Sequence, residues 1–242
     1  MKPKEIFFIA AEPSSDLHGS MLATELLRRG DYRLTGAGGT LMRQAGVQTD
    51  FDSTTWPVIG LVQAAKRIPE GLATRPRILR LLRERRPDLL LLMDFGGFNV
   101  NLARHVRALP WHQPILYYFP PKSWDKRPRD RSWLAGLTDA VATPFDWSER
   151  LLRQDGVNAH WVGHPVVDRI QPAADVAALR AQMGLPAAAH VIGLMAGSRR
   201  LERHLIGPQL LGAARLLRQE GERHFLWSPG PPGTVDQVPI PV

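Results

Sequence analysis

The chain has 242 residues, a formal net charge of +8 and an isoelectric point of about 10.5. It contains no cysteine, which excludes disulfide bonds, thiolate zinc sites and cysteine nucleophiles. The N-terminal apolar run is too short for a signal peptide and no stretch approaches membrane-spanning length, so we expect a cytoplasmic protein.

The first segment predicts a strand, a loop and a helix. Residues 6–9 form a short apolar run within the strand expected at 5–10, and a helical pattern of leucines occupies 17–29. The loop between them contains Glu12, Ser14 and Asp16. Such a loop either turns the chain or offers backbone N–H groups and carboxylates to a ligand, and both interpretations stay open at this point.

Strand-like and helix-like segments alternate along most of the chain. We expect strands at 5–10, 32–35, 88–94, 114–118, 138–142, 158–162, 190–195 and 223–227, and helices at 17–29, 39–45, 74–86, 98–108, 146–154, 175–183 and 203–219. Alternation of this kind predicts an α/β fold, with right-handed crossovers and a Rossmann-like, doubly wound parallel sheet. The strand expected at 88–94 is continuously apolar from residue 89 to residue 93. Asp94 stands at its carboxyl end and therefore lies at the crevice where such sheets bind ligands, unless it caps the following helix.

The glycines at 36–39 do not complete a dinucleotide fingerprint, because the position of the third glycine is Leu41 and the loop follows the second strand. A tight turn explains them better. No phosphate-binding lysine loop is present, and we expect no cofactor and no metal.

Two basic segments, 66–86 and 122–131, are either solvated surface or sites for an anionic partner. In the first, an apolar helix face of Ile78, Leu79 and Leu82 accompanies the arginines. In the second, Trp124 lies among the cations. We expect peripheral binding to an anionic membrane surface; nucleic-acid binding is disfavoured because no nucleic-acid motif accompanies the charge.

A change in composition near the end of the strand at 158–162 predicts a domain boundary. We expect an N-terminal α/β domain at 1–164, the start of a second α/β domain at 165–228, and an irregular proline-rich tail at 229–242. Two strands and two helices cannot complete a doubly wound domain, so we expect the second domain to be incomplete in this chain.

The second domain contains Gly197, Ser198 and Arg199 between a strand and a helix. Backbone N–H groups at a helix N-terminus, together with an arginine, suit a phosphate group, although a plain turn would use the same residues.

In chain order, these motifs resemble the lipid-A-disaccharide synthase family, whose members are inverting glycosyltransferases of the two-domain GT-B fold. The matching segments are Ala11-Glu12-Pro13-Ser14-Ser15-Asp16, Asp94-Phe95-Gly96-Gly97-Phe98-Asn99, Tyr117-Tyr118-Phe119-Pro120-Pro121-Lys122-Ser123-Trp124, Gly163-His164-Pro165-Val166-Val167-Asp168 and Ala196-Gly197-Ser198-Arg199-Arg200-Leu201-Glu202. Ala11 and Ser15 replace family glycines, and Gly97 replaces a family acid.

The resemblance implies a reaction and a set of roles. A 2,3-diacylglucosamine 1-phosphate acceptor would attack a UDP-2,3-diacylglucosamine donor. Asp94 or Glu12 would supply the base, and Ser14, Asp16, Asn99, Trp124 and His164 would contact substrate. Gly197, Ser198, Arg199 and Glu202 would bind the diphosphate. This enzyme would act in the cytoplasm at the inner face of the cytoplasmic membrane.

A second hypothesis is a truncated, inactive paralogue or fragment that binds an acylated phosphosugar or a partner without turnover. Gly97 and the shortness of the chain relative to the family favour it, and we expect little transfer activity from these 242 residues alone. The oligomeric state does not follow from the sequence.

Overall fold

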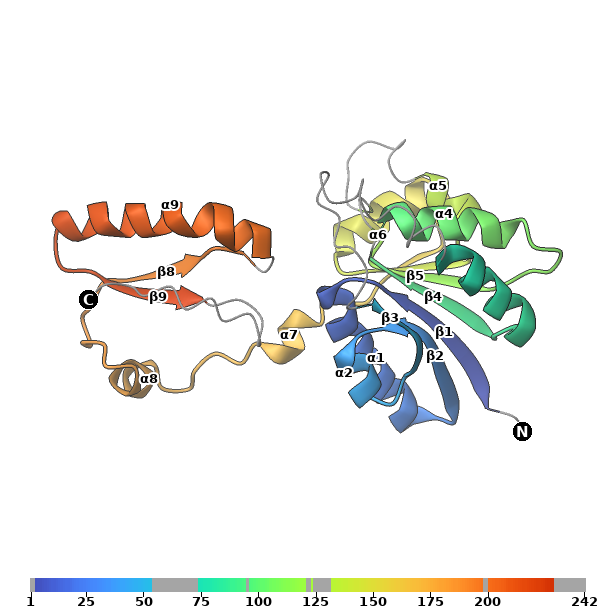
Figure 1. Ribbon diagram of the computed structural model, residues 1–242, viewed down its shortest axis with the longest axis horizontal. Coiled ribbons are helices and arrows are strands. Elements are labelled where there is room, and N and C mark those ends of the chain that lie inside the picture. Colours follow the sequence, from blue (N-terminus) through green and yellow to red (C-terminus); the bar gives the residue numbers. More distant parts are fainter. Residues whose placement is uncertain are drawn as a thin grey trace. The chain divides into compact units, whose positions relative to one another are not determined.

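The computed structural model describes residues 3–53, 74–94, 96–120, 123, 132–197 and 200–228, without the side chains of 200 and 201. The chain divides into two compact units, Met1–Ile170 and Gln171–Val242, and each is described by itself (Figure 1). The division falls after Ile170, whereas the sequence predicts it after His164. A short helix between these two positions, α7 at Val166–Arg169, therefore belongs to the N-terminal unit.

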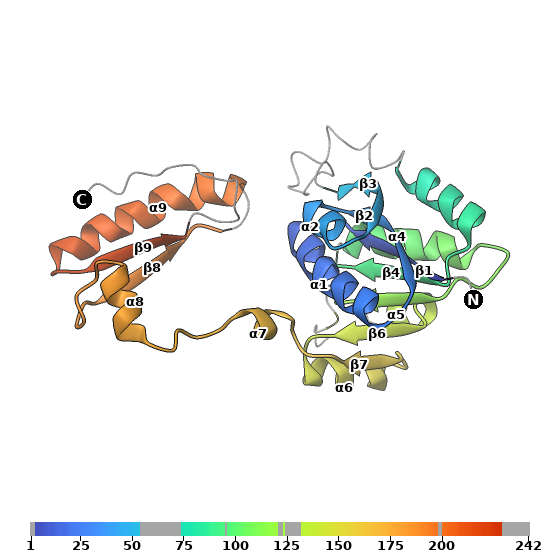
Figure 2. The ribbon, with the colours of Figure 1, turned by 90° about the horizontal axis from the view of Figure 1, so that it is seen from below.

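The N-terminal unit is built on a parallel sheet of seven strands in the order β3-β2-β1-β4-β5-β6-β7 (Figure 2). The strands are β1 Lys4–Ala10, β2 Tyr32–Gly38, β3 Gln48–Asp52, β4 Leu89–Met93, β5 Ile115–Tyr118, β6 Ala140–Thr143 and β7 Ala159–Trp161. The order reverses between β1 and β4, which makes their carboxyl ends the switch point of a doubly wound sheet. The α/β, Rossmann-like fold is confirmed.

Helices cover both faces of this sheet (Figure 1). They are α1 Pro13–Arg29, α2 Thr40–Gln44, a helix at 74–85, α4 Gly96–Arg107, α5 Trp133–Leu137 and α6 Asp146–Gln154. Side chains of β1 alternate between the two layers: Phe7 and Ile9 join one core cluster, and Ile6, Phe8 and Ala10 join the other. Burial on both faces explains why this strand is apolar from Ile6 to Ala10.

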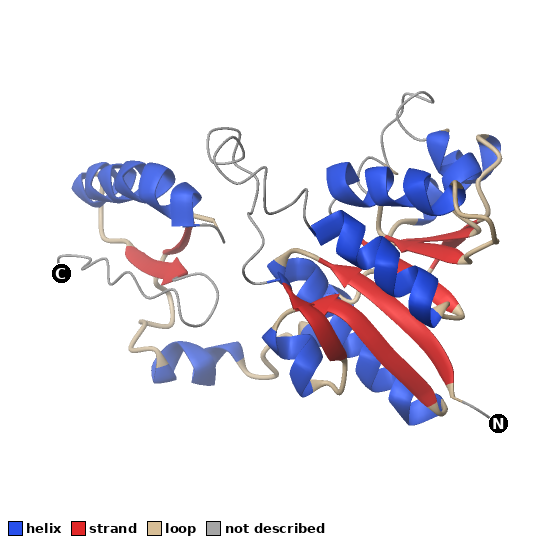
Figure 3. Cartoon of the chain, turned by 45° about the vertical axis from the view of Figure 1, so that its right-hand side comes forward, coloured by secondary structure: helices blue, strands red, loops and turns tan. Residues whose placement is uncertain are grey.

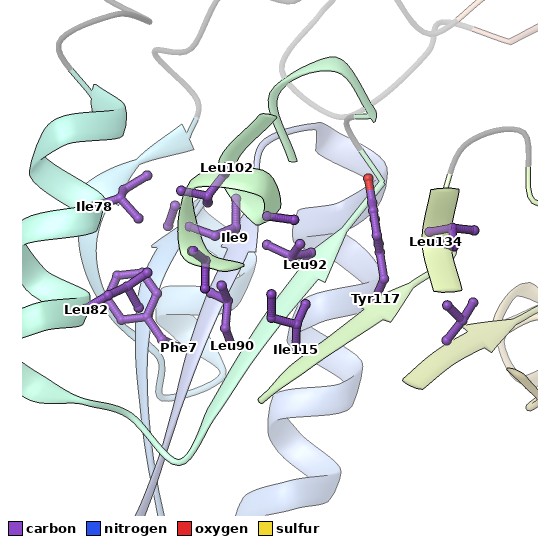
Figure 4. Packing of buried hydrophobic residues seen from close by; sticks show 14 of the residues in the cluster. Phe7, Ile9, Ile78, Leu82, Leu90, Leu92, Leu102, Ile115, Tyr117 and Leu134 are labelled. Atoms are coloured by element: carbon purple, nitrogen blue, oxygen red, sulfur yellow. The ribbon is translucent and has the colours of Figure 1, made fainter. Parts of the chain in front are cut away.

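The apolar face of the helix at 74–85 is part of the core, which corrects the expectation that it adds to membrane binding. Ile78 and Leu82 are fully buried against the cluster that contains Phe7 and Leu90, and Leu79 is 8% exposed (Figure 4). Apolar periodicity is the same whether a helix faces a sheet or a lipid surface. Its exposed side chains include Arg77, Arg80 and Arg83.

Of the second basic segment, 122–131, the structure describes only Ser123, which is buried. Two aromatic residues that precede the segment are also buried: Tyr117 fully, and Phe119 with 4% exposed. Trp124 and the cations of 122–131 lie outside the described residues.

Three short elements, β3, α5 and α7, were not expected from the sequence, and α1 begins at Pro13 rather than at residue 17. Proline suits the first position of a helix because its missing N–H has no partner there. The Ser15 hydroxyl supports the new start, since it accepts a hydrogen bond from the Glu12 N–H at 2.9 Å.

The C-terminal unit contains α8 Val176–Gln182, β8 Val191–Met195, α9 Arg200–Gln219 and β9 His224–Ser228. Strands β8 and β9 are parallel neighbours, and α9 runs beside them (Figure 3). Among the helices described in either unit, none is long and apolar enough to cross a membrane.

Candidate functional site

The carboxyl ends of β1 and β4 bring two predicted site residues together. Ala10 pairs with Met93 in the sheet, so the residues that follow, Glu12 and Asp94, emerge at the same edge. The Ser14 hydroxyl donates to Asp94 Oδ2 at 3.5 Å, and the charge of Glu12 acts on the Asp94 carboxyl. Glu12, Ser14 and Asp94 therefore form a carboxylate cluster at the switch point.

Burial shifts the protonation of this cluster. The pKa of Asp94 is raised to about 6, mainly by burial and in addition by the nearby Glu12 carboxylate, while the Ser14 hydrogen bond opposes both effects. A carboxylate with a pKa near 6 is a better proton acceptor at neutral pH than an ordinary aspartate. The cluster thus suits general base chemistry.

The backbone of Asp94 has an uncommon conformation, with φ of 45°. Its carbonyl oxygen accepts two hydrogen bonds, from Asn99 Nδ2 at 2.9 Å and from the Tyr117 hydroxyl at 2.8 Å. Asn99 Nδ2 also donates to the Met93 carbonyl at 3.0 Å. Asn99 is fully buried, so its amide binds the backbone behind the carboxylate cluster.

Asp16, another predicted site residue, is bound to the chain itself. Its carboxylate accepts hydrogen bonds from the backbone N–H groups of Gly39 (2.7 Å), Leu41 (3.1 Å) and Met42 (3.1 Å), at the start of α2. A Cβ atom at Gly39 would lie 2.5 Å from Asp16 Oδ2. Asp16 and Gly39 therefore have a structural role, since the Asp16 carboxylate binds the turn at 36–39 and leaves no room for a side chain at Gly39.

Aromatic and imidazole rings lie at the same edge of the sheet. The ring centroids of His18 and His164 are 5.5 Å apart, and Phe119 lies 6.1 Å from His18 and 5.7 Å from His164. His164 Nδ1 accepts from the Val166 N–H at 3.1 Å, which places the ring proton on Nε2. Burial lowers the pKa of His18, and His164 and Arg169 lower it further, so His18 is neutral at pH 7.

The charges of Asp94 and Asp168 both act on Tyr118. The pKa of Tyr118 is raised to about 12, mainly by burial and in addition by these two charges. His18 was not predicted as a site residue. In a helix that begins at Pro13, His18 lies four residues after Ser14 and therefore on the same face. The sequence predicted that the helix begins after Asp16, so this shared face was not recognised.

The predicted diphosphate residues belong to the C-terminal unit. Gly197 has φ of +99°, a backbone conformation that favours glycine. A Cβ atom at this position would also lie 2.5 Å from Glu202 Oε2, so both the backbone and the contact favour glycine. Ser198, Arg199 and Trp124 lie outside the described residues. Among the residues the structure does describe, no group of three or more His, Asp or Glu side chains could hold a metal ion.

Residues 6–229 match a family model described as lipid-A-disaccharide synthetase. The chain belongs to this family. It is 36% identical over 217 residues to the lipid-A-disaccharide synthase of Geobacter metallireducens, covering 89% of this chain and 56% of that protein. It is 32% identical over 238 residues to the corresponding protein of Anaeromyxobacter sp. strain K, covering 98% and 61%. The chain therefore spans little more than half the length of these lipid-A-disaccharide synthases.

Solved structures of similar fold include a Neisseria meningitidis UDP-GlcNAc 2-epimerase bound to UDP-GlcNAc (TM-score 0.58, 13% identity, covering 96% of this chain and 67% of that chain). The glycotransferase of kitacinnamycin is another (TM-score 0.56, 16% identity, covering 98% and 69%). At these identities the likeness concerns the fold alone. It places this lipid-A-disaccharide synthase family member among GT-B-like proteins.

Proposed function

We propose that this chain acts in the reaction of its family, the transfer of 2,3-diacylglucosamine from UDP to 2,3-diacylglucosamine 1-phosphate in lipid A biosynthesis. The observation that carries the proposal is the pairing of Asp94, with its pKa near 6, and Glu12 at the switch point of the N-terminal unit. Family membership supports the substrates. The UDP-GlcNAc held by the solved epimerase of similar fold supports a UDP-sugar donor.

In the proposed mechanism Asp94 is the general base. The 6-hydroxyl oxygen of the acceptor forms a bond to the anomeric carbon of the donor while its proton passes to the Asp94 carboxylate. The bond from the anomeric carbon to the diphosphate oxygen breaks, UDP leaves with the electron pair, and the anomeric centre inverts. Burial, together with the charge of Glu12, keeps the pKa of Asp94 high enough for this proton transfer.

The leaving diphosphate is assigned to the C-terminal unit. Gly197, Ser198 and Arg199 precede the 20-residue helix α9, and backbone N–H groups at a helix N-terminus attract an anion. Glu202, which contacts Gly197, would hold this turn in shape. In the N-terminal unit, Ser14 and His164 would contact the acceptor, as would Trp124, whereas Asp16 and Asn99 would act by supporting the backbone.

A second candidate is binding of an acylated phosphosugar without transfer. Gly97 favours it, because the family acid at this position is missing.

The test follows disaccharide formation by mass spectrometry and UDP release by a coupled assay, using the purified chain and both acylated substrates. We expect slow transfer, reduced about 10²- to 10⁴-fold by Asp94→Asn, as for loss of a general base. Asp31→Asn, an exposed change beyond α1, is the matched control and should leave the rate unchanged. Acceptor binding by calorimetry without any disaccharide would favour the second candidate, and an unaltered rate in Asp94→Asn would refute Asp94 as the base.

A further inference from the structure

Two buried side chains bind the backbone of Asp94. With φ of 45°, Asp94 lies in the left-handed region that an aspartate enters only when its surroundings favour it. The carbonyl oxygen of Asp94 is the atom that the surroundings hold, through the Tyr117 hydroxyl and Asn99 Nδ2.

Both donors are placed where water does not compete with them. Tyr117 and Asn99 are each 0% exposed. Burial raises the pKa of Tyr117 far above neutrality, so the hydroxyl keeps its proton and remains a donor at working pH. Two buried donors on one carbonyl oxygen give a fixed orientation of the peptide group that follows Asp94.

The amide of Asn99 is used through its nitrogen. Nδ2 donates to the carbonyls of both Met93 and Asp94, whereas Oδ1 is buried without a hydrogen-bond partner in the part of the chain that the structure describes. Leaving a buried oxygen unpaired opposes folding. The Asn99 amide therefore stabilises the end of β4 through Nδ2, while the unpaired Oδ1 opposes folding.

We infer that Tyr117 and Asn99 are positioning residues, which clamp the Asp94 carbonyl so that the Asp94 carboxyl stays turned toward Ser14 and Glu12. Without the clamp, the backbone relaxes to negative φ and the Cα–Cβ bond swings away from that edge. This inference rests on the proposed function for its catalytic meaning, but the clamp itself is independent of turnover.

The test removes one hydroxyl. Tyr117→Phe keeps the buried ring and deletes only the donor to Asp94, and the carboxyl of Asp94 is titrated by ¹³C NMR, its signal assigned by its loss in Asp94→Asn. We expect the pKa of Asp94 to fall by about one unit, because the carboxyl moves from Glu12 toward water. The acid limb of the pH–rate profile should move to lower pH by the same amount, with kcat reduced and KM little changed.

Tyr32→Phe is the matched control, since Tyr32 begins β2 at the opposite end of the strands and should leave the titration of Asp94 unchanged. A Tyr117→Phe protein that melts earlier while Asp94 titrates as before would refute the clamp and leave Tyr117 as a packing residue. Asn99→Ala provides a second deletion of a donor, with the same expected shift. If the titration shifts but the parent chain makes no disaccharide, the clamp stands and the proposed function fails.

Discussion

Asp94 stabilises the folded chain less when it is charged than when it is protonated. Its pKa of about 6 lies above the ordinary value of 3.8, so folding favours the protonated form. The resulting loss of stability is absent below pH 3.8, grows between pH 3.8 and 6, and is complete above pH 6, where it amounts to about 3 kcal/mol. Functional sites commonly give up folding stability of this kind for chemistry.

We therefore expect Asp94→Asn to stabilise the protein at pH 8 by up to about 3 kcal/mol, and to have little effect at pH 4, because the amide mimics the protonated acid. Urea denaturation of both proteins at the two pH values measures the difference. An equal change in the free energy of unfolding at pH 4 and pH 8 would show that the burial of the Asp94 charge is not its cause.

Gly97 occupies the second position of α4, where a Cβ atom would meet nothing within 4 Å. Gly97→Asp should be accommodated and should raise the free energy of unfolding by about 0.5–1 kcal/mol, because a negative charge at a helix N-terminus is favourable. Gly97→Asn, which has the same shape without the charge, is the control. A lower stability for the aspartate than for the asparagine would contradict the expectation.

The sequence predicted part of the site. That Glu12 and Asp94 meet follows from the rule that parallel strands end at one edge, which needs only the strands to be recognised. The partners of Asp16 could not be predicted, because its three hydrogen bonds join residues 23 to 26 positions apart through the packing of α1 against α2. The buried hydroxyl of Tyr117 acts on Asp94 in the same long-range manner.

At the scale of elements, the carboxylate of Asp16 connects α1 to the start of α2. Asp16→Ala leaves three backbone donors without their acceptor, and we expect a loss of about 2–3 kcal/mol in the free energy of unfolding. Asp175→Ala removes a single exposed cap at the start of α8 and should have a much smaller effect. Chemical denaturation of the three proteins checks both values, and equal losses for the two variants would show that the contact with α2 adds nothing.

The longer elements were predictable because their apolar patterns are long. Strand β3 was missed because Phe51 is its one buried side chain, so an edge strand of mostly polar residues shows no alternation. Helices α5 and α7 are five and four residues long, too short for a helical period to be recognised. The sequence correctly predicted that Ile78 and Leu82 form an apolar helix face. It could not predict that this face packs against the sheet, because helical periodicity does not show what an apolar face contacts.

At the scale of the molecule, both core clusters of the sheet lie within the N-terminal unit. We expect residues 1–170 to fold on their own, because the seven strands and the helices on both faces are all included. Amide NMR spectra of this segment should superimpose on the corresponding signals of the whole chain. A spectrum with the narrow dispersion of an unfolded chain would show that the core depends on residues after 170.

The membrane binding predicted from the sequence is electrostatic for the helix at 74–85, because the apolar face of this helix is buried. With exposed cations contributing about 1 kcal/mol each, the protein should co-sediment with anionic vesicles, be released by high salt, and ignore zwitterionic vesicles. Arg80→Gln with Arg83→Gln should weaken sedimentation, whereas Arg28→Gln on α1, in the opposite layer, should not. Unchanged sedimentation of the double variant would exclude this helix as the contact.

Strands β1 and β4 are neighbours in the sheet, although Ala10 and its partner Met93 are far apart in the chain. A ribosome that adds about 5–20 residues per second needs roughly 4 to 17 seconds to travel from one to the other. During that interval one side of β1, which is apolar from Ile6 to Ala10, has no partner and remains open to solvent or to other nascent chains. The arrangement that joins the two carboxylates thus creates a period in synthesis when the chain is prone to aggregate, and when a chaperone that binds extended apolar segments would act.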